Sequence, residues 1–230
     1  MSTPLLPTPL PLTALIHRLS LDPMRCLTPP HPWAPMSDAE WNAIAPFLAA
    51  QGCGLSFAPR AGRPPVDTRA RLDAIFRAVL LKAPGGGRGT WRQLPPEFGK
   101  PDTVSRTYRR WARANLWARL LVEIACPTCP PILRRLAYRI CCAFRRGIRL
   151  MGFRAILLAR RLRLFSALPA PPNFLPDPDL SETLSPILPG LIARTAANPG
   201  WRAPRALLRA LDGLMRLARG RRIRRWMEPA

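Results

Sequence analysis

The chain has 230 residues, of which 30 are proline, and its formal net charge is +23. Prolines at this frequency interrupt helices and strands, so one large core is not expected, and no run of about twenty uncharged apolar residues suggests a membrane span. So large a positive charge implies a polyanionic partner, either nucleic acid or an anionic membrane surface, and charge alone does not choose between them.

Residues 1–36 are rich in proline and have no helical apolar period, which predicts a disordered leader. An early basic region is missing and prolines interrupt the apolar run, so no secretory signal is predicted and we expect a cytoplasmic protein. Because the first helix signal follows Met36 directly, translation from Met1 and translation from Met36 are both left open.

The first helix is predicted to begin after Ser37, which can form a capping box with Glu40. Its apolar residues recur at helical spacing, and Pro46 is expected to kink or end it. A GRPP turn at 62–65 then precedes a second helix over Thr68–Lys82. Asp67 is its expected N-cap, and its apolar stripe consists of Leu72, Ile75, Phe76 and Val79.

Glycines at 85, 86, 87 and 89 follow the second helix. No lysine follows the last glycine, so a flexible connector is favoured over a phosphate-binding loop. Trp91, Leu94 and Phe98 anchor a short third helix, and residues 99–102 form a turn.

A fourth helix is expected with Asp102 as its cap. Val104, Tyr108 and Trp111 lie at i, i+4 and i+7, so they should face inward while the arginines between them project elsewhere. Asn115 suits a left-handed conformation before a last helix that closes the core. Residues 37–124 are therefore predicted to be an all-α, small helical bundle with a helix-turn-helix-like element.

Residues 125–230 carry twenty arginines against five acidic residues and are predicted to be a basic, helix-prone tail of low order. The run 132–168 mixes arginines with large apolar residues without a clean polar face. Residues 169–189 are a linker by composition, in which Asp177-Pro-Asp179 is expected to be a solvated turn. Residues 204–226 are a second Arg-rich amphipathic candidate.

The sequence offers little support for metal, cofactor or nucleophilic chemistry. Cys126 and Cys129 with Cys141 and Cys142 could supply four thiolates, but the adjacent pair lacks the usual spacer of a zinc site, so reduced cysteines are favoured. Both histidines lie in the leader, which leaves no credible Ser/His/Asp arrangement. We therefore expect no metal, no cofactor and no small-molecule substrate.

Taken in order, these motifs resemble the N-terminal DNA-binding domain of bacterial insertion-element transposases of the four/five insertion-sequence superfamily. The corresponding segments are SDAEW at 37–41, GRPP at 62–65, LDAIFRAVL at 72–80, WRQLPPEFG at 91–99 and YRRWARANLWARLL at 108–121. The family usually has a shorter connection where this chain has residues 83–91. The resemblance implies that this part of the chain binds double-stranded DNA.

In the family, this domain precedes a catalytic domain of ribonuclease-H type, whose three carboxylates bind two divalent metals for strand cleavage. After Glu123, this chain has only five acidic residues, in or near Pro-rich segments, with no β-rich pattern to hold them. We therefore expect a protein that is not an enzyme by itself. Some elements of the family divide the two halves between reading frames, so the chain also resembles a fragment completed by frameshifting or by a catalytic half in trans.

The candidate DNA-binding residues lie mainly on the fourth helix. N-terminal residues of a recognition helix approach base edges, so Thr103, Ser105 and Arg106 are predicted to read the major groove. Arg109, Arg110 and Arg113 are predicted to contact phosphates, with Arg92 and Arg63 as further DNA-binding candidates.

Two alternatives to this interpretation remain open. The arginines could form a merely solvated face, or the run 132–168 could make the chain a cationic membrane-surface protein. Whether the protein forms a homodimer is also left open.

Overall fold

The computed structural model describes residues 27–54, 67–84 and 87–220. Its regular elements are all helical, and one isolated antiparallel bridge joins Lys82 to Arg88, so the predicted all-α class is confirmed for these residues. The α-helices are α2 (Asp38–Ala50), α3 (Thr68–Leu80), α4 (Pro101–Arg113), α5 (Leu116–Ala125), α6 (Pro131–Arg135), α7 (Ala137–Met151), α8 (Phe153–Arg161), α9 (Pro178–Leu184), α10 (Ile187–Ala197) and α11 (Arg205–Arg219). Short 3-10 turns are η2 (Trp91–Gln93), η3 (Pro96–Phe98), η4 (Phe165–Ala167) and η5 (Pro172–Phe174).

N-terminal caps define where the first two helices begin, as the sequence predicts. The amide of Glu40 donates a 3.2 Å hydrogen bond to Oγ of Ser37, and the amide of Ser37 donates one of 2.9 Å to Oε2 of Glu40. Asp67 caps α3, since its Oδ1 accepts from the amide of Arg69 at 2.9 Å. Pro46 does not end α2, which continues to Ala50.

The start of α4 differs from the prediction. Asp102 is not the cap: the N-cap is Lys100, which makes no side-chain capping bond, and Pro101 is the first helical residue. Proline suits this position because its fixed φ is helical and its missing N–H would have no helical partner there. Asn115 has the predicted left-handed conformation, with φ of 60°, between α4 and α5.

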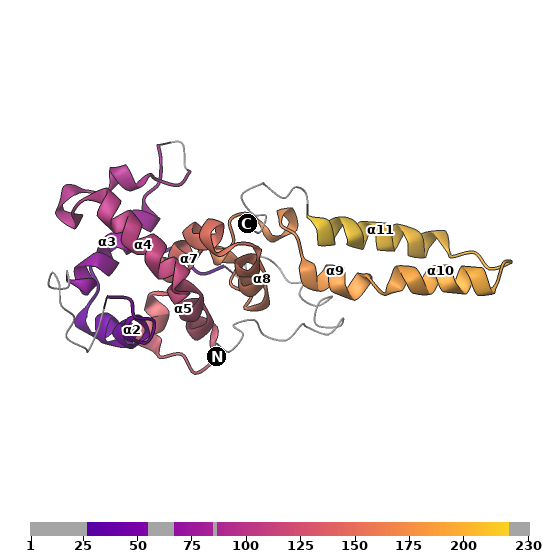
Figure 1. The fold of residues 1–230 in the computed structure, drawn as a ribbon, viewed down its shortest axis with the longest axis horizontal. Helices are drawn as coiled ribbons and strands as arrows, with labels where there is room; N and C mark the ends of the chain where they lie inside the picture. The colour runs from indigo at the N-terminus through magenta and orange to yellow at the C-terminus, as the bar shows by residue number, and fades with distance from the viewer. Residues whose placement is uncertain (1–26, 55–66, 85–86, 221–230) are drawn as a thin grey trace.

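One large core joins the predicted bundle to the first part of the tail. Helices α3, α4 and α5 all pack against α7, which lies beside them in Figure 1. Ile140, Phe144 and Ile148 of α7 are fully buried, because their spacing of four residues puts them on one face. The prediction of low order after residue 124 is therefore wrong for these helices, and residue 124 does not mark a boundary of the core.

The end of the predicted leader is also part of this core. Met36 is buried, and its amide donates a 3.1 Å hydrogen bond to Oδ1 of Asp73. The ring of Trp33 meets the ring of Phe98 edge-on, with centroids 5.3 Å apart. Disorder is thus the wrong prediction for residues 27–36, because apolar side chains there find partners on other elements; residues 1–26 lie outside the described part of the chain.

Helices α9, α10 and α11 form an arm that extends from the main body (Figure 1). α9 packs against α11, and Leu180, Leu184, Leu211 and Ala218 form a second, small apolar cluster between them.

Asp177 and Asp179, at the base of this arm, are buried rather than in a solvated turn. Arg160 and Arg161 of α8 form ion pairs with them, at 3.1 Å and 2.5 Å respectively. The solvated turn expected from the sequence is wrong, because charged partners on α8 compensate both carboxylates.

Candidate nucleic-acid interface

α4 presents one exposed basic face. Successive helical residues are rotated by about 100°, which places Arg106, Arg109, Arg110 and Arg113 within one sector of the helix, and all four are exposed. Thr103 is exposed in the same sector, at the beginning of the helix. The structure therefore gathers these five predicted site residues on one surface.

The opposite side of α4 holds the helix in the core. Val104, Tyr108 and Trp111 are at most 2% exposed, as their spacing predicts. The aromatic rings of Trp111 and Trp117 pack with centroids 6.3 Å apart, and Tyr108 stacks on Trp117 at 5.5 Å. This packing fixes the rotation of α4 and hence the direction of its arginines.

Ser105 does not belong to the exposed face. It is only 6% exposed, because its position on the helix lies about 100° from that of Arg106, on the side that packs inward. The prediction that Ser105 reads base edges is therefore wrong for the described conformation.

The remaining predicted residues flank the helix. Arg92 is exposed on η2, next to Trp91, whose ring lies 5.1 Å from that of Tyr108. The expected third helix is replaced by η2 and η3, and Thr90 forms a capping box with Gln93 at the start of η2. Arg63 lies outside the described residues.

Among the residues that the structure describes, no acidic side chain pairs with the charges on the exposed face of α4. Ion pairs among the described residues join Arg69 to Asp38, Arg160 to Asp177, Arg161 to Asp179 and Arg216 to Asp212. None of them involves an arginine of α4. Asp102 is the acidic residue of α4 itself, and it lies in the first turn, where the helix dipole favours a negative charge. The face therefore remains strongly positive and open to an anionic partner.

Three of the five acidic residues after Glu123, namely Asp177, Asp179 and Asp212, have basic or backbone partners. Asp177 caps α9 through Leu180, and Asp179 accepts two hydrogen bonds from Nε and Nη2 of Arg161. Asp212 pairs with Arg216 on the surface of α11. Within the described ranges, no three His, Cys, Asp or Glu side chains are placed to hold a metal ion.

The five cysteines in the described part of the chain are free, and most of them are buried. Cys141 and Cys142 lie on α7 in the main core, and burial raises the pKa of Cys141 to about 12. Burial also raises the pKa of Cys129, although Arg134 opposes this shift. Both thiols are therefore protonated at neutral pH.

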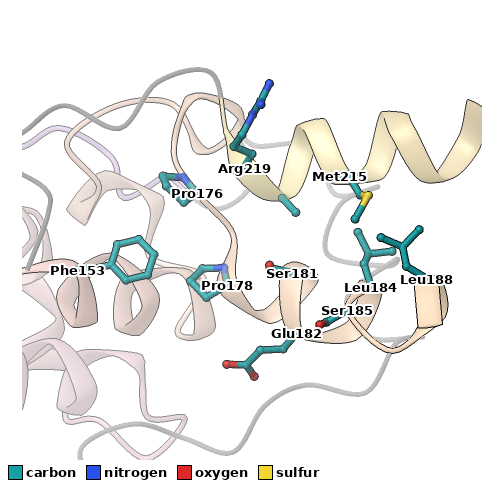
Figure 2. Close-up of a pocket in the computed structure, with 11 residues that line it drawn as sticks. Phe153, Pro176, Pro178, Ser181, Glu182, Leu184, Ser185, Leu188, Met215 and Arg219 are labelled. Atoms are coloured by element: carbon teal, nitrogen blue, oxygen red, sulfur yellow. The ribbon is translucent and has the colours of Figure 1, made fainter. Parts of the chain in front are cut away.

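A cavity of about 570 Å³ lies at the base of the arm, between α8, α9 and α11 (Figure 2). Phe153, Pro178, Leu184 and Met215 give it a largely apolar lining. Its carboxylate, Glu182, is exposed on α9, and among the described residues no histidine, cysteine or second carboxylate lines the cavity beside it.

None of the helices in the described part of the chain is both long and apolar enough to cross a membrane.

Residues 36–121 match the model of a family described as "Putative transposase of IS4/5 family (DUF4096)". The matched segment runs from just before α2 into α5 and includes the whole of α4. This confirms the resemblance of that part of the chain to insertion-element transposases. No curated protein and no solved structure matches the chain.

Proposed function

We propose that this chain is a DNA-binding protein that recognises insertion-element DNA through α4 and does not itself carry a strand-transfer active site. The observation that carries this proposal is the exposed face of α4, where Arg106, Arg109, Arg110 and Arg113 have no acidic partner among the described residues. The transposase family match over the same segment supports a transposase-related role.

In this proposal α4 enters the major groove with its N-terminal half toward the bases. Thr103 and Arg106 contact base edges, where the guanidinium of Arg106 fits the two acceptors of guanine. Arg109, Arg110 and Arg113 contact backbone phosphates, together with Arg92 on η2. Ser105 takes no part, since it is buried.

The absence of a strand-transfer site is proposed from the surroundings of the carboxylates. Two-metal strand cleavage needs carboxylates that are free to bind divalent cations. Asp177 and Asp179 are paired with buried arginines, and Asp212 is paired with Arg216. We therefore assign DNA strand cleavage to another protein product, made by frameshifting or supplied in trans. Homodimer formation is a separate question, to be answered by measuring the oligomeric state.

A DNA-binding function implies a place in the bacterial cytoplasm, with the nucleoid. The membrane-surface interpretation relied on apolar residues in the run 132–168. Ile140, Phe144, Ile148 and Ile156 of that run are fully buried in the core, so they do not offer an apolar face to lipid.

Selection of binding sites from a library of random duplexes tests this proposal. The purified full-length chain should enrich a defined sequence, because base-edge contacts by α4 discriminate between duplexes. Recovery of duplexes without any common sequence would contradict recognition and would leave only binding by charge.

A further inference from the structure

Two basic residues between α3 and η2 lie side by side in the backbone. Lys82 and Arg88 face each other in the isolated antiparallel bridge, and the amide of Gly89 donates a 2.9 Å hydrogen bond to the carbonyl of Leu81. A Cβ at position 89 would lie 2.8 Å from Cβ of Leu81, so glycine permits this close approach. The bridge therefore places the backbones of Lys82 and Arg88 side by side, and both residues are exposed.

Two further arginines, Arg145 and Arg146 of α7, belong to the same region. The guanidinium of Arg146 lies over the ring of Trp91, 4.1 Å from its centroid, and its Nη1 donates a 3.1 Å hydrogen bond to the carbonyl of Ala78. Nη2 of Arg145 donates to Sγ of Cys142 at 3.4 Å. Each guanidinium has five N–H donors, so these contacts leave most of them available for a ligand.

No carboxylate among the described residues pairs with Lys82, Arg88, Arg145 or Arg146. Burial, with a smaller effect of the positive charge of Arg88, lowers the pKa of Arg146 to about 10. Arg88 is exposed but partly desolvated by its surroundings, which lowers its pKa; Tyr108 opposes this shift and the positive charge of Arg145 adds to it. Like charges that lie close together and partly out of water destabilise the folded chain unless an anion joins them.

Trp91 connects this cluster to α4. Its ring lies under the guanidinium of Arg146 and 5.1 Å from the ring of Tyr108, and the next residue is the exposed Arg92. The cluster is thus adjacent to α4 on the side of Tyr108, and Arg92 offers an exposed positive charge beside it. An extended polyanion such as a duplex can reach both places, whereas a small anion would occupy only one.

We propose that Lys82, Arg88, Arg145 and Arg146 bind a backbone phosphate of the duplex that α4 recognises, an inference that rests on the proposed function. The planar fork of a guanidinium matches two phosphate oxygens, and a phosphate supplies the negative charge that the cluster lacks. Arg145 and Arg146 lie beyond the segment that matches the transposase family. The part of the chain after that segment therefore contributes directly to DNA binding through α7.

The test compares the salt dependence of duplex binding by full-length variants. Arg88→Gln/Arg145→Gln removes two charges from the cluster, and Arg205→Gln/Arg209→Gln removes two exposed charges from α11 as a matched control. The cluster variant should weaken binding to a selected duplex and to its scrambled version equally. Its plot of log K against log salt should be shallower by about 0.9 for each phosphate that the variant no longer neutralises, and the control should stay closer to the parent.

Two more variants guard against effects on folding. Lys82→Gln changes an exposed side chain and should also flatten the slope, and Arg88→Lys/Arg145→Lys should keep most of the parent slope because it keeps the charges. Equal slopes for the cluster variant and the α11 control would overturn the phosphate site. Loss of discrimination between selected and scrambled duplexes in the parent would instead overturn recognition by α4, so the two failures are distinguishable.

Discussion

The hydroxyl of Tyr108 donates a 2.7 Å hydrogen bond to the main-chain carbonyl of Ala143, and this bond ties α4 to α7. The two helices approach so closely here that a Cβ at Gly147 would lie 2.9 Å from the same hydroxyl. Burial raises the pKa of Tyr108, so the hydroxyl stays protonated as the donor. The helix proposed to read DNA is thus held in place by a helix that follows the family-matched segment.

Replacing Tyr108 by Phe should lower the free energy of unfolding by roughly 0.5–1.5 kcal/mol, because it removes one buried hydrogen bond and no apolar contact. Urea denaturation of the full-length chain measures this loss. Tyr138→Phe, at a half-buried position on α7, is the matched control and should cost less. Equal stabilities of the parent and the Tyr108 variant would show that the bond between α4 and α7 contributes nothing.

A fragment of residues 36–124 should lose cooperative folding, because it lacks α7. Tyr108 and Trp117 are buried in the full core and would become exposed to water in the fragment. Residues 27–220 should show a sigmoidal thermal transition by circular dichroism, whereas the fragment should show a broad one. A sharp transition in the fragment at the temperature of the longer chain would contradict a core shared with the tail.

Replacing Asp179 by Ala should destabilise the arm by about 3–5 kcal/mol, because the Arg161 side chain, which is 7% exposed, would lose its charge partner. Asp212→Ala removes the exposed partner of Arg216 and should cost about 0.5 kcal/mol or less. Urea denaturation compares the two variants. Replacement of both Arg161 and Asp179 by Leu should lower the free energy of unfolding less than Asp179→Ala alone, because no unpaired charge is left buried. The opposite order would mean that the attraction within the ion pair exceeds the cost of removing its two charges from water.

The full-length chain should not nick supercoiled plasmid in the presence of magnesium, because three of the carboxylates after Glu123, at positions 177, 179 and 212, are engaged by arginines and are not free to bind metal together. Gel electrophoresis after incubation with plasmid measures nicking. Magnesium-dependent cleavage that disappears in Asp179→Ala would contradict the proposal that the active site is carried elsewhere.

Features that depend on near neighbours in sequence could be predicted, whereas those that depend on distant partners could not. The capping by Ser37 and Asp67 and the left-handed Asn115 follow from the residues within a few positions of them. The burial of Asp177 depends on Arg160, seventeen positions away, and composition alone contained no sign of that partner.

The same distinction between near and distant neighbours applies to the candidate nucleic-acid interface. The inward phase of Tyr108 and Trp111 predicted which arginines of α4 are exposed, since a helix has a fixed period. Ser105 lies at the edge between the two faces, where burial depends on the width of the packed surface rather than on periodicity. The role of α7 in the core and beside α4 could not be predicted. Its arginines alternate with apolar residues, so the sequence did not show which side of the helix packs against α3, α4 and α5.

Recognition by α4 is tested most directly by the sequence dependence of two arginine substitutions in the full-length chain. The affinities of the parent, Arg106→Ala and Arg113→Ala are measured on a selected duplex, on its single-base variants and on a scrambled duplex at one salt concentration. Arg106→Ala should lose roughly 1–3 kcal/mol of discrimination at one base pair, while Arg113→Ala should weaken binding to all duplexes about equally. Equal losses on every duplex for both substitutions would contradict base readout and would leave α4 as a contact to the DNA backbone alone.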